Sequence, residues 1–366
     1  MNERATQNAH EAHFFPVVTT ALVAPCVIAF LLLWIIGIAG SAQPGAFALS
    51  SLWAIPNDAQ LLQRAGALEL TRIWLDGEWW RVLSAPFLHG SWIHLVLNMV
   101  ALWSVGGWIE LAWGRAYTAA MFILASIGGC LASLLWAEAS VIVGASGGIL
   151  GLAGALWLAR RLGDATLKDL LEPVSARQLG WMIGLVIVLG AVIPVIAQAG
   201  HLGGLAVGLA MAAPMLRQKL GLSLLSGLLL VGAATPLANA PTWRTNYFTF
   251  MGFRHLREDN GPKALEYLEA ALARSPDDPS LANAVAYELS LEGVLLDRAT
   301  TLVEFALEKE PENPDFLDTR GWILCRQGNA EEGREWLRRA VEADDDPPEE
   351  ILEHVDTCDS AALPIQ

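Results

Sequence analysis

Seven long apolar stretches recur along the first two thirds of the chain, and a stretch of about 20 apolar residues is long enough to cross a lipid bilayer as a helix. They cover residues 16–40, 92–112, 115–137, 143–161, 178–197, 199–217 and 219–238. Several contain glycine, which membrane helices use for close packing. The pattern predicts an all-α, polytopic membrane bundle of six helices plus a seventh span, which contains Pro236 and is the least regular of the set.

A long, Trp-rich connection separates the first two stretches, over about residues 41–90. A connection of this length is expected to have structure of its own, and residues 57–76 show a helical pattern. Basic residues lie beside the spans at three places. These are Arg115, the group Arg160, Arg161, Lys168 and Arg177, and the pair Arg217 and Lys219. All three share one side of the predicted bundle, and the positive-inside rule makes that side cytoplasmic. The N-terminus then starts in the cytoplasm, and the Trp-rich loop and the tail after a seventh span lie outside.

The tail, residues 243–366, repeats with a period of 34 or 35 residues. The positions that recur are Ala271, Ala306 and Ala340, Pro276 and Pro311, and Gly252 and Gly321, with Tyr287 where the middle unit should have Gly. This spacing resembles the tetratricopeptide (TPR) pattern of paired helices, with units near 245–278, 280–313 and 314–347. A generic helical bundle is the alternative. The repeat favours an α-helical, TPR-like solenoid with a concave surface for a peptide or protein.

Composition and charge separate the chain into two parts. Hydrophobic residues make up 54% and charged residues 17%, whereas soluble domains carry about 25% charge. Residues 1–242 hold 11 Lys/Arg and 11 Asp/Glu, and residues 243–366 hold 12 and 27, so the whole net charge of −15 lies in the tail. An acidic tail disfavours nucleic acid as a partner and favours basic ligands.

The four cysteines give no zinc-site spacing, and we predict neither a metal nor a cofactor. Cys26 and Cys130 lie in apolar runs, as small core residues do. Cys325 and Cys358 lie in the tail and can pair only if the tail faces an oxidising compartment. Residues 1–13 are polar and lack the pattern of a cleaved signal peptide or organelle presequence, which favours a bacterial inner membrane.

Two polar residues stand among glycines in the apolar stretches. Ser146 lies in Gly144-Ala145-Ser146-Gly147, at the start of the fourth stretch, and His201 begins the sixth. Alone, such a serine most often bonds its own helix, whereas a histidine at membrane depth marks a functional site. Gly204 and Gly208 form a bare helix face, and Gly147 and Gly151 form another. Two such faces pack closely, which would bring Ser146 and His201 together as nucleophile and base; a structural hydrogen bond between the helices is the alternative.

The second stretch carries a third polar group. His94 and Asn98 are four residues apart and share one helical face, and His89 precedes them in the loop. Both side chains on that face can donate hydrogen bonds to an anionic tetrahedral intermediate, or they can join helices. Three polar groups at the same side of three helices favour the first interpretation.

Together these residues resemble the rhomboid family of intramembrane serine proteases. The resemblance covers about residues 16–217 and rests on an ordered set: Trp80-Arg81, His89, His94, Asn98, Glu110, Gly144-Ala145-Ser146-Gly147, His201, Gly204 and Gly208. It implies that Ser146 is the nucleophile and His201 the general base, without a carboxylate. It also implies that Asn98, His94 and the Ser146 backbone N–H hold the oxyanion, that His89 supports the site entrance, and that Trp80-Arg81 anchors the first loop.

The chain departs from the pattern of the rhomboid family at two positions. Many relatives carry an aromatic residue, which stacks on the histidine, where this chain has Leu150. The His201 ring must therefore pack against other neighbours, with Trp157 and Met121 as candidates. At the second position, Gln198 replaces the more frequent Asn or Asp. The expected domains are an N-terminal tail (1–15), a six-helix core (16–217), a seventh span with linker (218–242) and a repeat domain (243–366).

The predicted function is serine endopeptidase activity on transmembrane protein substrates within the lipid bilayer, with the repeat tail as a protein-interaction domain. A catalytically silent, membrane-anchored TPR scaffold is the alternative. Inactive members of the family usually lack the serine or the histidine, whereas this chain has both. A transporter or channel is a third class. It is disfavoured because the polar residues cluster near one face and form no ionisable path across the membrane.

Overall fold

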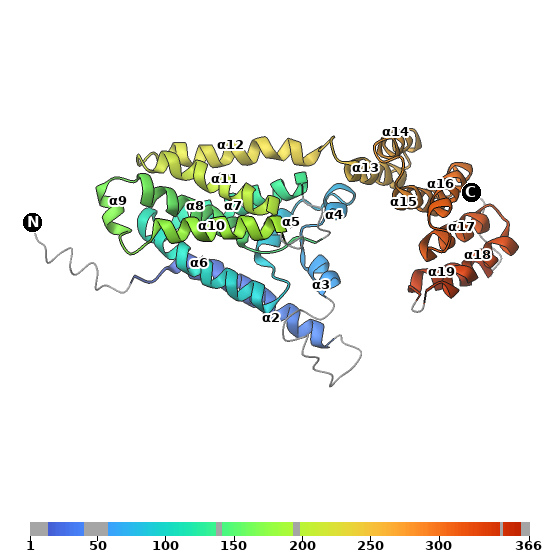
Figure 1. Cartoon of the computed structure of the whole chain (residues 1–366), viewed down its shortest axis with the longest axis horizontal. Helices are drawn as coiled ribbons and strands as arrows, with labels where there is room; N and C mark the ends of the chain where they lie inside the picture. Colours follow the sequence, from blue (N-terminus) through green and yellow to red (C-terminus); the bar gives the residue numbers. More distant parts are fainter. Residues whose placement is uncertain (1–13, 40–57, 137–140, 193–197, 345–346, 360–366) are drawn as a thin grey trace, which may run out of the picture. The chain divides into compact units, whose positions relative to one another are not determined.

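The computed structural model describes residues 14–39, 58–136, 141–192, 198–344 and 347–359. Every regular element in these ranges is a helix, as the apolar pattern predicts, and the only β-type pairing among them is an isolated bridge between Leu68 and Ile142. The chain forms two compact units (Figure 1). The first, the membrane unit, holds Met1–Ile73 and Gly77–Pro241, and the second, the tail unit, holds Trp74–Asp76 and Thr242–Gln366. The expectations for residues 1–13 and for the loop over 40–57 lie outside the described residues.

Seven helices of the membrane unit correspond to the seven apolar stretches: α2 (Val17–Ala39), α6 (Trp92–Trp113), α7 (Arg115–Trp136), α8 (Ser146–Leu162), α10 (Ala176–Val192), α11 (Gln198–Met215) and α12 (Leu220–Asn239). Among the described residues, α2, α6, α7 and α12 are long and apolar enough to cross a membrane by length and composition alone. The shorter helices are α3 (Asp58–Ala65), α4 (Leu70–Trp74), α5 (Arg81–Ser84), η2 (Ala85–Phe87) and α9 (Ala165–Leu170).

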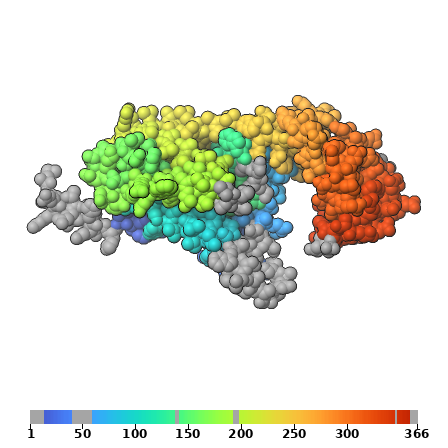
Figure 2. Space-filling view, viewed as in Figure 1, coloured from blue at the N-terminus to red at the C-terminus, as the bar shows by residue number. Residues whose placement is uncertain are grey.

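Helices α7, α8 and α11 form the centre of the membrane unit, where they pack closely on one another. Figure 1 shows α12 along one edge of this unit and α2 with α6 along the opposite edge. Buried apolar side chains fill the centre, among them Met121, Phe122 and Leu152. The outer helices turn large apolar side chains outward, and Leu229 of α12 is 63% exposed; the space-filling view shows α12, in yellow, lying on the surface (Figure 2). Such an outer surface suits contact with lipid.

Helix α12, where the sequence predicts a seventh span, is joined to the other helices of the membrane unit by polar contacts. Ser223 Oγ donates to the Met211 carbonyl over 2.6 Å and lies 2.6 Å from Tyr117 Oη, and Ser226 Oγ donates to the Ala210 carbonyl over 2.9 Å. Buried hydroxyls in an apolar surrounding need such partners. The helix continues past Pro236 to Asn239.

Glu110 fixes the start of α2. Its carboxylate is fully buried and accepts hydrogen bonds from the backbone N–H groups of Val18 and Thr19 and from the Thr19 hydroxyl, at 2.9–3.1 Å. Arg115 Nε lies 3.5 Å from the same carboxylate. A helix N-terminus leaves N–H groups without partners and favours negative charge, so this carboxylate caps α2 from a neighbouring helix.

The helical pattern predicted over 57–76 is wrong as one element, because the structure contains two short helices there, α3 and α4. Between them Gly66 has φ +102°, a conformation that ends a helix and that glycine adopts without steric cost. A β-carbon at Gly66 would also overlap the Trp80 ring. The local pattern could not show this contact with a distant ring.

The tail unit is built from three antiparallel helix pairs and a final helix. The pairs are α13 (Thr245–Arg257) with α14 (Gly261–Leu272), α15 (Pro279–Leu291) with α16 (Leu296–Lys309), and α17 (Pro314–Arg326) with α18 (Ala330–Glu342); α19 (Glu349–Asp359) follows. The placement of Tyr287 at a glycine position is wrong. The connection after α15 is one residue longer than those after α13 and α17, so counting back from Ala306 by the spacing of the other units reaches a residue one position too late. Counted from the start of the first helix of each pair, the equivalent eighth residue is Gly252, Ala286 or Gly321. Each helix pair therefore has a small residue at the same position of its first helix.

Cys325 and Cys358 form a disulfide between α17 and α19, whereas Cys26 and Cys130 are buried free thiols.

Candidate active site

Ser146 and His201 lie within hydrogen-bond distance of each other, 55 residues apart in the chain. Ser146 Oγ is 2.8 Å from His201 Nε2. Ser146 is the first residue of α8 and His201 is the fourth of α11, so both lie near the start of their helices. The His201 side chain is buried, and within the described residues its Nδ1 has no hydrogen-bond partner. A serine hydroxyl against a neutral imidazole is the arrangement that allows proton removal during nucleophilic attack.

Glycines set this distance by allowing α8 and α11 to touch backbone to backbone. A β-carbon built on Gly204 would overlap the Gly147 carbonyl oxygen, and one on Gly208 would overlap the Gly151 carbonyl oxygen. Gly147 in turn faces the Gly200 carbonyl oxygen, 3.2 Å from the position of a β-carbon. Gly147 and Gly200 are the neighbours of Ser146 and His201, so this contact places the two side chains.

The segment that leads into Ser146 is held by the first loop. Ile142 and Leu68 exchange backbone hydrogen bonds of 2.9 and 3.0 Å, and the Gly144 N–H donates to the Ala85 carbonyl over 3.0 Å. Gly144 has φ +120°, which favours glycine. Sequence reasoning missed the bridge, because a two-residue pairing across 74 positions leaves no local pattern beyond the β-branched run Val141-Ile142-Val143.

His94 lies against this segment. A β-carbon on Gly144 would lie 2.7 Å from His94 Cε1, so only glycine fits beside the ring. Asn98, one turn further along α6, is buried and donates from Nδ2 to the His94 carbonyl over 2.8 Å, which leaves its second amide N–H for another acceptor. His89 is fully buried in the loop before α6, with its ring centroid 5.0 Å from that of His94.

Arg81 joins the parts of the first loop. Its guanidinium donates to the Gln63 and Ala67 carbonyls over 2.6 and 2.9 Å and pairs with Glu78, although the side chain is almost fully buried. Trp80 is 50% exposed, and its ring lies 4.8 Å from the Arg81 guanidinium carbon. Arg81 thus anchors the loop from inside, while Trp80 presents an aromatic surface.

Neither of the two candidates for packing against the His201 ring, in place of an aromatic residue at position 150, lies near that ring. Trp157 is 11 residues beyond Ser146 on α8, about 16 Å along a helix, and it packs against Gly180 of α10. Met121 is eight residues, or about 12 Å, before Gly129, which packs at the level of Gly147 and Gly200. Both side chains therefore lie two or three turns away from the level of the His201 ring.

The start of α8 adds a further chemical feature. The backbone N–H groups in the first turn of a helix have no partner within the helix, and the helix dipole makes them attractive to negative charge. Because Ser146 opens α8, its own N–H belongs to this set. A hydroxyl, an imidazole and the first-turn N–H groups of a helix therefore meet at one place, a combination suited to acyl transfer.

Comparison with known proteins relates the chain to one family. Residues 76–218 match the rhomboid domain. The chain is 28% identical over 267 residues to the rhomboid protease GluP of Bacillus subtilis (70% of this chain and 50% of that protein), and 31% identical over 162 residues to the mitochondrial RHOMBOID-like protein 6 of Arabidopsis thaliana (43% and 50%). It is 36% identical over 117 residues to the Rhomboid-like protease 5 of Toxoplasma gondii (32% and 13%). The matches span at most half the length of each of these relatives. The matched domain and these relatives together support the rhomboid family for residues 76–218 and an integral membrane location for the chain.

Proposed function

We propose that the membrane unit is an intramembrane serine endopeptidase that hydrolyses peptide bonds of transmembrane proteins in the lipid bilayer. His201 Nε2 takes the proton of Ser146 Oγ as the oxygen attacks the scissile carbonyl carbon. The oxyanion that forms is held by the Asn98 and His94 side chains and the Ser146 N–H. The proton passes to the leaving amine, the C–N bond breaks, and water then hydrolyses the acyl-enzyme by the same base.

The observation that carries this proposal is the 2.8 Å contact between Ser146 Oγ and His201 Nε2. A purely structural hydrogen bond would require no particular neighbours. Here the serine also opens a helix, glycines on both sides allow the His94 ring and the α11 backbone to approach it closely, and a buried asparagine retains an unused N–H. The similarity to proteins named rhomboid proteases supports the same reaction.

The test uses the purified full chain in liposomes with a model transmembrane substrate, and Ser146→Ala and His201→Ala as variants. The wild type is expected to cleave, and both variants are expected to lose cleavage while keeping the wild-type melting temperature. Cleavage that is equal in all three proteins would refute the dyad. A wild type that does not cleave would favour the catalytically silent scaffold.

For the tail unit, we propose a TPR-like solenoid, over residues 243–366, that binds a basic peptide or protein segment on the extracytoplasmic side. Its helix pairs recur at 34–35 residues, and it holds the whole net charge of −15, which would steer basic ligands toward it. The disulfide supports the extracytoplasmic side, because such bonds persist in oxidising compartments. The six-helix core (16–217) and the seventh span with its linker (218–242) complete the proposed domains.

Two measurements test the tail. A membrane-impermeant maleimide applied to intact cells after mild reduction should label Cys325 and Cys358; labelling only after lysis would reverse the proposed side. Deletion of residues 243–366 should leave cleavage of a simple substrate intact. Loss of that cleavage in a folded deletion variant would make the tail part of the catalytic core.

A further inference from the structure

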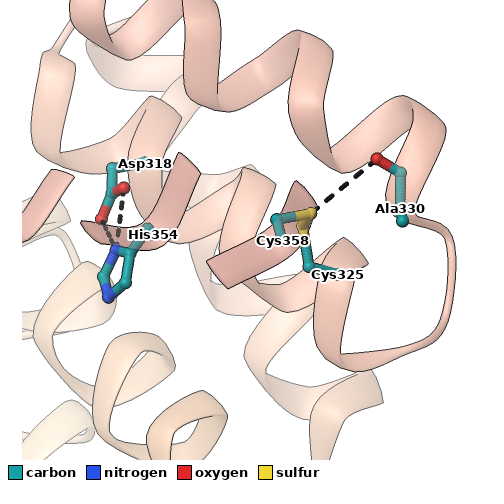
Figure 3. Close-up of a disulfide and its surroundings, with 5 residues drawn as sticks. All are labelled: Asp318, Cys325, Ala330, His354 and Cys358. Atoms are coloured by element: carbon teal, nitrogen blue, oxygen red, sulfur yellow. Dashed lines mark hydrogen bonds and ion pairs between the residues drawn. A yellow bond between two sulfur atoms is a disulfide. The ribbon is translucent and has the colours of Figure 1, made fainter. Parts of the chain in front are cut away.

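The last helix of the tail unit faces α17 along one stripe. Glu350, His354 and Cys358 follow one another at intervals of four residues on α19, so they share a face. Opposite them on α17 lie Asp318, Trp322 and Cys325, at intervals of four and three. Figure 3 shows the two ends of the contact, with Asp318 against His354 and Cys325 bonded to Cys358.

At one end the contact is covalent. The two cysteines have Cα atoms 5.8 Å apart, and their side chains are only 4% and 3% exposed. Gly333 of α18 packs on the bond, since a β-carbon there would lie 2.5 Å from Cys325 Sγ. Cys358 Sγ lies 3.8 Å from the Ala330 carbonyl oxygen. A disulfide sulfur has no proton to donate, so this contact becomes a hydrogen bond only for the reduced thiol. A reductant reaches this bond only when α19 moves away.

At the other end the contact is a chain of hydrogen bonds. His354 Nδ1 lies 2.9 Å from Asp318 Oδ2, and Nε2 lies 3.3 Å from Tyr287 Oη of α15. Tyr287 donates its proton to Glu350 over 2.5 Å. The Asp318 carboxylate accepts, so Nδ1 donates to it. His354 therefore joins α19 to α17 through Asp318 and to α15 through Tyr287.

The Trp322 ring of α17 stacks on the imidazole, with the ring centroids 4.4 Å apart. This end of α19 is therefore held by hydrogen bonds and a ring contact instead of a covalent bond.

We propose that α19 is a latch on the tail unit with two fastenings, the Cys325–Cys358 disulfide and the hydrogen-bond chain through His354. The second controls access to the first. While the chain is intact, α19 stays seated and shields the disulfide. When the chain breaks, α19 opens often enough for a reductant to convert the disulfide to two thiols with two electrons and two protons. The freed helix then uncovers the carboxylate and indole of α17. The proposal is independent of the protease chemistry of the membrane unit.

The test follows reduction of the oxidised full chain, in detergent, by a water-soluble phosphine. The phosphine becomes a phosphine oxide, takes its oxygen from water, and leaves two thiols, which are trapped with maleimide and counted by mass. Wild type and His354→Gln are compared at one pH and one phosphine concentration. His255→Gln, a buried histidine on α13 of the same unit, is the matched control.

The wild type should be reduced about tenfold more slowly than His354→Gln, as expected for loss of one charge-assisted hydrogen bond. His255→Gln should follow the wild type. Tyr287→Phe, which removes only the hydroxyl, should also be reduced faster than the wild type. Reduction of His354→Gln at the wild-type rate would overturn the proposal. Free thiols at 325 and 358 in protein purified under non-reducing conditions would also overturn it.

Discussion

The glycine contact between α8 and α11 makes a strong prediction about catalysis. A β-carbon at Gly204 would lie 2.8 Å from Gly147 Cα and closer still to its carbonyl oxygen. Ordinary carbon–carbon contacts are about 3.5–4.0 Å, so Gly204→Ala must separate the helices by about 1 Å. Gly147 directly follows Ser146, and the same displacement therefore reaches the nucleophile.

Two quantities should respond. Overpacking of this size costs about 1–3 kcal/mol of stability, and a 1 Å misplacement of reacting groups costs about 10²-fold in rate. Cleavage of a transmembrane substrate in liposomes gives the rate, and thermal melting in detergent gives the stability. An organophosphorus probe that bonds only to an activated serine reports the dyad separately from substrate binding.

The matched control is Gly232→Ala in α12, where a β-carbon would have no neighbour within 4 Å. This change should preserve cleavage and probe labelling, and it should slightly favour the helix, since alanine exceeds glycine in helix propensity by about 1 kcal/mol. If Gly204→Ala cleaved as fast as Gly232→Ala, close packing of the two helices would not set the geometry of the dyad.

Three other changes test separate parts of the chain. Asn98→Ala should slow cleavage about 10²–10³-fold with little change in substrate affinity, as for loss of one oxyanion donor; unchanged turnover would remove Asn98 from that role. Glu110→Ala leaves two backbone N–H groups at the start of α2 without an acceptor, at about 1–3 kcal/mol each, so the melting temperature should fall, and Glu110→Gln should recover part of the loss. Burial, and then the hydrogen bond to Glu350 and its charge, raise the pKa of Tyr287 above its ordinary value. The folded tail thus keeps this proton longer than the unfolded chain, and stability falls above pH 10 by at most about 1.4 kcal/mol per pH unit; urea unfolding of Tyr287→Phe should show a shallower fall, and an equal slope would contradict the assignment.

Local pattern was sufficient for the helices and insufficient for their details. The apolar stretches predicted seven helices because a segment in lipid must satisfy its own backbone hydrogen bonds, a requirement that each segment meets alone. The pattern over 57–76 failed because Gly66 turns the chain to admit the Trp80 ring. The position given to Tyr287 failed because one extra residue after α15 shifts the register.

The sequence by itself determined the kinds of residue available for the candidate site. Ser146, His201, His94 and Asn98 stand out because polar groups are costly in apolar helices, and the glycine spacing indicated which faces would meet. The tertiary structure decided the 2.8 Å between Ser146 and His201, the bridge between Leu68 and Ile142, and the stripe that joins α19 to α17. These contacts join residues 33–74 positions apart. Their geometry depends on how whole helices pack against one another. It is therefore determined jointly by the two segments in contact, and neither segment predicts it alone.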